Sequence, residues 1–186
     1  HKYMDLLTGL PHLKVIEGKA KFIEKNIVEV NGELYEGSKI IIATGATTLI
    51  PEINGINDVP YLTSKTLFEL EQQPQSLIIL GAGYIALEIA QAYQRMGTKV
   101  TIIQRSKSIL SKETKDITDE LEKHLSEEGI NFLTGTTINK GWKEGTNIKI
   151  SYTTSVGETE AIEGSHIVIA TGTKGNTSDL GLEKTG

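Results

Sequence analysis

The chain has 186 residues, with 19 Lys and Arg against 24 Asp and Glu, 19 Gly and no Cys. Its net charge of −5 argues against a nucleic-acid binder, which needs a basic surface to hold phosphates, and no apolar run approaches the roughly 20 residues that span a bilayer. The lack of cysteine excludes disulfides, zinc–thiolate sites and thiol nucleophiles in this sequence. The length allows one large domain or two small ones.

The first part of the chain predicts short strands. Apolar and polar residues alternate over 13–17, and further strands are expected within 21–30. Asn31 and Gly32 favour a hairpin turn, because both residue types tolerate positive φ. Residues 39–43 form a continuous apolar run, which predicts a strand buried on both faces, as in a parallel sheet.

A connector and a βαβ pattern follow. Pro and Gly punctuate residues 46–75, where only a short helix is expected, near 65–71. An apolar strand is then predicted over 77–80, a helix with apolar residues at helical spacing over 84–96, and a second strand over 100–104. About 30 residues is the usual size of one βαβ unit.

The rest of the chain predicts an α/β fold with an antiparallel addition. We expect a helix over 113–128 and a strand over 130–133. Residues 147–153 and 158–162 read as an antiparallel pair, and 166–170 as a last buried strand.

Two segments far apart in the sequence are nearly identical. Ile40–Gly45 reads IIIATG and Ile167–Gly172 reads IVIATG, each closing a predicted strand before a loop. Two similar nucleotide-binding halves in one chain would produce such an echo.

The residues between these segments contain a dinucleotide fingerprint of the form G-x-G-x-x-A. Gly81 permits a tight turn, Gly83 lets the backbone approach a pyrophosphate, and Ala86 permits close packing of helix and strand. The helix N-terminus then offers free N–H groups and its positive dipole end to the phosphates. Because the flanking strands and helix supply the required context, we predict dinucleotide binding over a glycine turn in an unrelated α/β domain.

The end of the second predicted strand indicates NADP. Gln104 stands where an NAD site has an acidic residue for the ribose 2′-hydroxyl, and Arg105, Ser106 and Lys107 follow at once. A guanidinium and a hydroxyl suit a 2′-phosphate. The alternative is that Arg105 and Lys107 are solvated loop charges at an indifferent site.

Other polar residues give weaker indications. On position alone, Glu88 has a solvent-facing or salt-bridging role at least as readily as a functional one, and Tyr84 is a partly buried aromatic. The four histidines are scattered, without a second ligand at metal spacing or a Ser/His/Asp constellation. We therefore predict neither a metal site nor a catalytic residue in this sequence.

Two Ala-Thr-Gly strand ends with G-x-G-x-x-A between them resemble the pyridine nucleotide–disulfide oxidoreductases, flavoproteins that include glutathione reductase and lipoamide dehydrogenase. The phrase GAGYIALE, from Gly81 to Glu88, is specific for this group. The resemblance covers essentially the whole chain. It implies part of an FAD-binding domain over 1–50, a connector over 51–72, a Rossmann-like NADPH-binding domain with a parallel sheet and an antiparallel β-meander over 73–175, and a return segment over 176–186.

Within the family, the mercuric reductases fit best. Lys2-Tyr3 at the start, Pro60 to Ser64 and Val100 to Ser106 resemble their sequences. The family's FAD fingerprint, redox cysteine pair and C-terminal dimer domain are missing, and neither end of the chain closes an element. We therefore expect a piece of a longer cytoplasmic, homodimeric enzyme, inactive by itself. The family's Arg-x-Pro-Asn after the last Ala-Thr-Gly is replaced here by residues 173–176, TKGN.

The resemblance implies a reaction and leaves alternatives. In such enzymes hydride passes from NADPH to FAD, and electrons continue through a cysteine pair to Hg(II) or a disulfide. A lipoamide dehydrogenase or a glutathione-reductase-like enzyme is one alternative, although Gln104 and Arg105 weigh against the NAD-using lipoamide enzyme. A stand-alone dinucleotide-binding module without redox chemistry is the other.

Individual roles follow from the same resemblance. Tyr84 resembles a gate over the flavin, and Glu88 resembles the acid that holds a flavin-domain lysine. The residues expected at NADPH are Gly81, Ala82, Gly83, Tyr84, Ile85, Ala86, Glu88, Gln104, Arg105, Ser106 and Gly172. The residues expected at the ADP half of FAD are Gly18, Ala20, Thr44 and Gly45.

Overall fold

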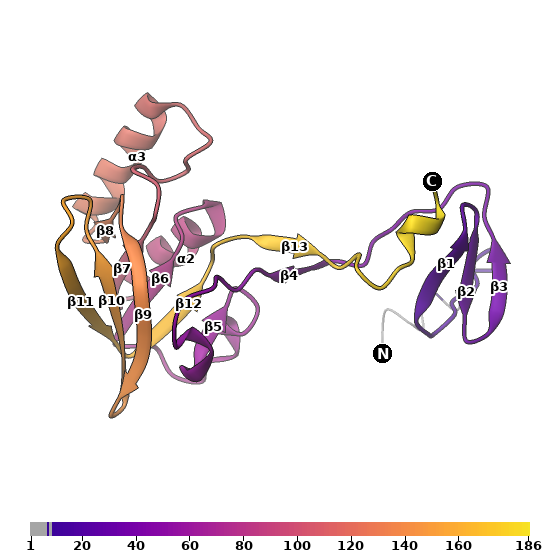
Figure 1. Ribbon diagram of the computed structural model, residues 1–186, viewed down its shortest axis with the longest axis horizontal. Coiled ribbons are helices and arrows are strands. Elements are labelled where there is room, and N and C mark those ends of the chain that lie inside the picture. Colours follow the sequence, from indigo (N-terminus) through magenta and orange to yellow (C-terminus); the bar gives the residue numbers. More distant parts are fainter. Residues whose placement is uncertain (1–6, 8) are drawn as a thin grey trace. The chain divides into compact units, whose positions relative to one another are not determined.

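The computed structural model describes Leu7 and residues 9–186, which divide into two compact units (Figure 1). Unit 1 consists of the described residues up to Thr47 together with Gly175–Gly186, and unit 2 consists of Thr48–Lys174. Lys2 and Tyr3, which contribute to the family resemblance, lie outside the described residues. None of the helices in the described part of the chain combines the length and apolar character that a bilayer crossing requires.

Unit 2 is built on a five-stranded parallel sheet in the order β5-β12-β6-β7-β8 (Figure 1). Its strands are β5 (Tyr61–Thr63), β6 (Ser76–Leu80), β7 (Lys99–Ile103), β8 (Asn131–Leu133) and β12 (His166–Ile169). The four strands predicted here are confirmed to within one residue at each end. Strand β5 was not predicted, because it has only three residues and pairs along one edge.

Two helices cross between neighbouring strands of this sheet. Helix α2 (Tyr84–Arg95) joins β6 to β7, and helix α3 (Lys115–Glu127) lies between β7 and β8, so both predicted helices are confirmed. Each is followed within two residues by a glycine, Gly97 and Gly129. One side of α2 packs into the core with Leu77, Ile79 and Val168 of the sheet. The buried residues of α2 are Ala86, Leu87, Ile89, Ala90 and Tyr93.

A three-stranded antiparallel sheet covers the other side of the parallel sheet. It consists of β9 (Thr137–Glu144), β10 (Asn147–Thr153) and β11 (Thr159–Gly164), in the order β11-β10-β9. Ile148 and Ile150 of β10 pack in one core with Ile78, Leu80, Ile167 and Ile169 of the parallel sheet. The predicted β10–β11 pair is confirmed. Strand β9 was not predicted, because its residues are mostly exposed and lack a regular apolar alternation.

The segment before β6 contains less helix than predicted. Where a helix was expected near 65–71, only a 3-10 turn forms, at Leu67–Glu69, and a second such turn lies at Ile56–Asp58. Thr63 and Thr66 exchange side-chain contacts at the start of the 67–69 turn, with the Thr63 N–H donating to Thr66 Oγ1 (3.0 Å). This turn does not continue as an α-helix, because Leu70 follows in an extended conformation (φ −65°, ψ 126°).

Unit 1 contains a small antiparallel sheet. It consists of β1 (Ala20–Glu24), β2 (Ile27–Val30) and β3 (Glu33–Glu36), in the order β1-β2-β3. The predicted turn between β2 and β3 is confirmed, with Asn31 at φ 54° and Gly32 at φ 85°. The Phe22 N–H donates to the Leu180 carbonyl (2.7 Å), which connects β1 to the last part of the chain.

Two strands predicted in unit 1 are wrong. Residues 13–17 and 39–43 form no strand, and the Ile41 side chain is 91% exposed. A strand needs a partner for its N–H and C=O groups, and no strand of the described chain pairs with either segment. Two short strands that were not predicted, β4 (Ala46–Thr48) and β13 (Thr173–Gly175), pair with each other.

The predicted α/β class is therefore confirmed, with a parallel sheet and an additional antiparallel meander. Alternate residues of β6 face the two cores, so the sheet is covered on both sides. With both faces covered, the carboxyl ends of the strands are the place where ligands of parallel α/β sheets bind.

Candidate functional site

The turn between β6 and α2 lies against the ends of both neighbouring strands. Gly81 has φ 101°, its N–H donates to the Ile103 carbonyl (2.9 Å), and a Cβ atom there would lie 2.6 Å from the Ala170 carbonyl oxygen. A side chain at this position would be strained in its backbone and would clash with β12. The predicted tight turn is therefore confirmed in the structure, and Ala82 inside it is 1% exposed.

Gly83 lacks a side chain for a different reason. It precedes α2 in an extended conformation (φ −82°, ψ 178°), and a Cβ atom there would have no protein atom within 4 Å. The space beside Gly83 is open, whereas Ala86 one turn later is fully buried. Gly83 makes no side-chain cap, and the first turn of α2 contains no acidic residue. The first N–H groups of α2 are therefore available to an anion.

The segment after β7 is attached to the segment after β8. The Gln104 N–H donates to the Leu133 carbonyl (2.9 Å), and the Gln104 carbonyl accepts from the Thr136 N–H (3.0 Å). The Ser106 carbonyl accepts from the Gly135 N–H (2.8 Å). These bonds hold Ser106 half-buried and Arg105 exposed, and Arg105 has no ion-pair partner among the described residues. The sequence did not indicate that residues 133–136 contact Gln104 and Ser106, because these segments come together only in the folded chain.

Gly172 lies three residues after the end of β12, the third strand at this site. Thr171 Oγ1 donates to the Leu49 carbonyl (2.7 Å), and the Gly172 carbonyl accepts from the Leu49 N–H (3.0 Å). Strands β12, β6 and β7 are parallel neighbours. Gly172, the Gly81 turn and Gln104 follow the carboxyl ends of these strands and therefore lie at the same end of the sheet. The structure thus brings together the three sequence segments predicted to contact NADPH.

The exposed side of α2 carries the remaining predicted residues. Tyr84 is 60% exposed and Ile85 is 45% exposed, and Glu88 lies on the same open side of the helix. The Tyr84 hydroxyl donates to Glu113 Oε1, and this bond raises the pKa of Tyr84. Glu113 was not predicted, because it lies 29 residues further along the chain. Glu88 forms no ion pair with any residue that the structure describes.

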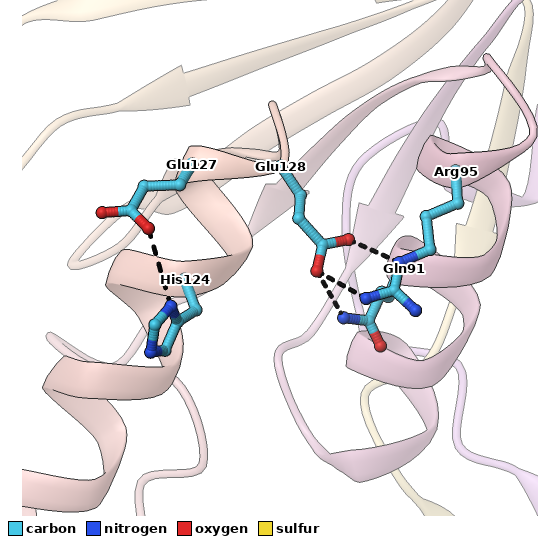
Figure 2. A network of polar contacts seen from close by, with 5 residues as sticks. All are labelled: Gln91, Arg95, His124, Glu127 and Glu128. Carbon is cyan, nitrogen blue, oxygen red and sulfur yellow. Dashed lines mark hydrogen bonds and ion pairs between the residues drawn. The ribbon is translucent and has the colours of Figure 1, made fainter.

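A polar cluster ties α2 to the end of α3 (Figure 2). Glu128 accepts from Arg95 Nε (2.7 Å) and a terminal Arg95 nitrogen (2.6 Å), and from Gln91 Nε2 (2.9 Å). Arg95 thereby lowers the pKa of Glu128. Figure 2 also shows His124 beside Glu127, with Nδ1 at 3.5 Å from Oε2. The cluster fixes the far ends of both helices and leaves the N-terminus of α2 free.

The residues expected at FAD all lie in unit 1. A Cβ atom on Gly18 would lie 2.6 Å from the Asn31 side chain, so this glycine is packed against the β2–β3 hairpin. Ala20 begins β1 and is exposed. Thr44 Oγ1 donates to the Asn176 carbonyl (2.7 Å), and the Gly45 carbonyl accepts from the Asn176 N–H (3.0 Å). Asn176 was not predicted as a contact of these residues.

No metal centre is evident in this part of the molecule. Over Leu7 and residues 9–186, no group of three or more His, Cys, Asp or Glu side chains is arranged to hold an ion. His124 contacts Glu120 (3.1 Å) and Glu127 on its own helix, and His166 Nδ1 lies 3.0 Å from Ser165 Oγ.

Comparison with known proteins gives consistent matches along the chain. Residues 1–186 match the family model described as pyridine nucleotide-disulphide oxidoreductase. The sequence is 40% identical over 185 residues to a mercuric reductase from Lysinibacillus sphaericus, and 38% identical over 185 residues to one from Staphylococcus aureus. Both alignments cover 100% of this chain and 34% of the relative. A dihydrolipoyl dehydrogenase from Geobacillus stearothermophilus is 31% identical over 94% of this chain and 37% of its own length.

A solved structure matches the fold as well. The HOCl-induced flavoprotein disulfide reductase RclA from Escherichia coli aligns with a TM-score of 0.85 and 30% sequence identity. The alignment covers 98% of this chain and 41% of that chain. The chain thus spans about a third of the length of the curated relatives it matches.

Proposed function

The chain belongs to the pyridine nucleotide-disulphide oxidoreductase family, and we propose that its unit 2 binds NADPH along the strand ends of β6, β7 and β12. The family implies FAD and a pyridine nucleotide as cofactors, and NADPH, when bound, supplies the hydride. The observation that supports this proposal most directly is Gly83. It leaves open space at a helix N-terminus that has neither a side-chain cap nor an acidic first turn.

In this proposal the diphosphate binds at the N-terminus of α2. The free N–H groups of the first turn donate to phosphate oxygens, and the helix dipole favours their negative charge. Gly81 keeps the turn tight against Ala170, so the backbone at Gly83 is presented to the ligand. Ala82, Tyr84, Ile85 and Glu88 complete this part of the site, and Gly172 approaches the nucleotide from the end of β12.

The preference for NADPH over NADH is assigned to the segment after β7. Arg105 is exposed and without an ion pair among the described residues, so its guanidinium is free to bind a 2′-phosphate. The Ser106 hydroxyl is a second donor. Gln104 occupies the position of the acidic residue that would repel this phosphate. The bonds from Gln104 and Ser106 to 133–136 hold the segment in place before the ligand arrives.

We further propose that the chain is part of a longer FAD-dependent mercuric reductase. The support is the 40% and 38% identity to two mercuric reductases, against 31% to the dihydrolipoyl dehydrogenase. Unit 1, which contains Gly18, Ala20, Thr44 and Gly45, is proposed to be part of the FAD-binding domain. The complete enzyme is proposed to be a cytoplasmic homodimer. A disulfide in place of Hg(II) is the alternative electron acceptor, for which the similarity to RclA is the support.

Nucleotide titration of the 186-residue chain tests the binding site. The fluorescence of NADPH should report binding, and Gly83→Ala should weaken it by about tenfold or more, or about 1.4 kcal/mol. The melting temperature should fall only slightly, because alanine is a poorer N-cap than glycine but the new methyl group has open space beside it. Gly175→Ala, the same change at an exposed glycine elsewhere, is the matched control. If Gly83→Ala binds NADPH as tightly as the wild type, the diphosphate does not bind at the N-terminus of α2.

The cofactor preference and the acceptor need separate measurements. Arg105→Ala should weaken NADPH by about tenfold to a hundredfold, the size of a lost charge-assisted hydrogen bond, and leave NADH unaffected. Equal affinity of the wild-type chain for both nucleotides would contradict the NADP assignment. For the acceptor, NADPH oxidation by the complete gene product should depend on Hg(II), and dependence on a disulfide instead would favour the alternative.

A further inference from the structure

The Glu113 carboxylate contacts the first side chain of the helix that begins at the proposed diphosphate site. Tyr84 is the first residue of α2 and directly follows Gly83, and its hydroxyl donates to Glu113 Oε1. Helix α2 has no acidic residue in its own first turn. Glu88 in the second turn is the first acidic residue of α2 itself, and Glu113 adds a carboxylate from another part of the chain.

The position of Glu113 is imposed by the segment before α3. The Leu110 N–H donates to the Ala82 carbonyl (2.9 Å), and the Glu113 N–H donates to the Leu110 carbonyl (2.8 Å). Leu110 is 8% exposed and has φ 42°, an unusual conformation for leucine, which persists only where its surroundings determine it. The segment is thus anchored to the fingerprint turn itself, and Glu113 is held on the same side of it as Tyr84.

Glu113 follows Lys112 in the sequence and forms no ion pair with it or with another cation of the described residues. Lys115, the nearest cation on α3, is paired with Asp119. The Debye length is about 30 Å at 0.01 M ionic strength. At low salt, a carboxylate one tyrosine side chain away from the start of α2 is therefore within electrostatic reach of an anion bound at that helix N-terminus.

We propose that Glu113 is a built-in electrostatic opponent of the nucleotide, held beside the diphosphate site by Tyr84. This inference rests on the proposed function, because it takes the diphosphate to bind at α2. The carboxylate lowers the affinity for both the reduced and the oxidised nucleotide, since both carry the same diphosphate. Weaker binding at one site mostly means faster dissociation, so Glu113 promotes the exchange of spent nucleotide.

The test is an NADPH titration of Glu113→Gln, which keeps an acceptor for Tyr84 and removes the charge. We expect about three- to tenfold tighter binding in low salt, and loss of this gain near 1 M salt, where the Debye length is about 3 Å. Glu127→Gln is the matched control, because it removes the same charge at the last residue of α3, roughly 18 Å from the start of that helix at 1.5 Å per residue. Its affinity should equal that of the wild type.

A second variant tests the role of Tyr84 as the holder. Tyr84→Phe releases the carboxylate into solvent, so we expect a smaller gain in affinity than for Glu113→Gln. The double variant should bind as Glu113→Gln does, because both changes act through one hydrogen bond. Independent, additive effects would overturn the proposal, as would an unchanged or salt-insensitive affinity of Glu113→Gln. If neither the wild type nor Glu113→Gln binds NADPH, the proposed function fails as well. If both bind it with equal affinity, only the role of Glu113 fails.

Discussion

The segments Ile40–Gly45 and Ile167–Gly172 differ at one residue out of six, and they have different structures. In the second segment, Ile167, Val168 and Ile169 are fully buried in β12, between β5 and β6. In the first segment no strand forms, and Ile41 is 91% exposed.

The difference shows that neighbours, and not local sequence, make a buried strand. Both segments have the β-branched residues that favour extended backbone. Strand β12 has a hydrogen-bonding partner along each edge and a packed core on each face. The described part of the chain offers the 40–43 residues no such partner. Strand propensity is realised only where pairing and burial offset the entropy of ordering the chain.

The largest expected contrast is in amide hydrogen exchange. The amides of Ile167 to Ile169 should exchange about a thousandfold or more slower than those of Ile40 to Ile42, since a central strand opens only by extensive unfolding. Exchange measured by NMR or mass spectrometry on the 186-residue chain checks this. Comparable protection of both segments would mean that the 40–42 residues are paired in solution.

A matched pair of core deletions should sharpen the comparison next. Ile169→Ala should destabilise unit 2 by about 2–5 kcal/mol, because it leaves a cavity between packed layers. Ile42→Ala, the same change at the matching position, should cost about 0.5 kcal/mol or less, because Ile42 is 44% exposed. Urea unfolding followed by Trp142 fluorescence reports unit 2, and circular dichroism reports the whole chain. Equal losses would contradict the comparison.

The smallest expected effect is one that the two segments share. Thr171 Oγ1 and Thr44 Oγ1 each donate to a backbone carbonyl at 2.7 Å. Thr171→Val and Thr44→Val should therefore cost similar amounts, about 0.5–1.5 kcal/mol each, the usual contribution of one hydrogen bond. Thermal unfolding of both variants measures this. If only Thr171→Val lowers the stability, the two segments differ in their threonines as well as in their isoleucines.

Much of unit 2 could be predicted because its signals are local. The β6–α2–β7 unit follows from apolar spacing and from Gly81 and Gly83, and its elements lie within one residue of the predicted positions. Strands β5 and β9 escaped prediction, because the first has only three residues and the second is mostly exposed. Strand β5 is placed by β12, more than 100 residues further along the chain, whereas β9 pairs with the next strand, β10.

The predicted contacts of the nucleotide show the same division. Gly81, Gly83 and Arg105 could be proposed from the sequence, because a short motif and a strand end single them out. Glu113 was not found, because its contact with Tyr84 depends on the bond between Leu110 and Ala82. No spacing rule connects residues 29 positions apart in separate elements.

The sequence by itself determined the α/β class, the fingerprint turn and the helix that follows it, because these depend on residue types a few positions apart. Tertiary structure alone decided which of the two isoleucine-rich segments is buried, and which carboxylate the Tyr84 hydroxyl contacts. Pairing, burial and electrostatic reach depend on distances in space, which the chain acquires only on folding.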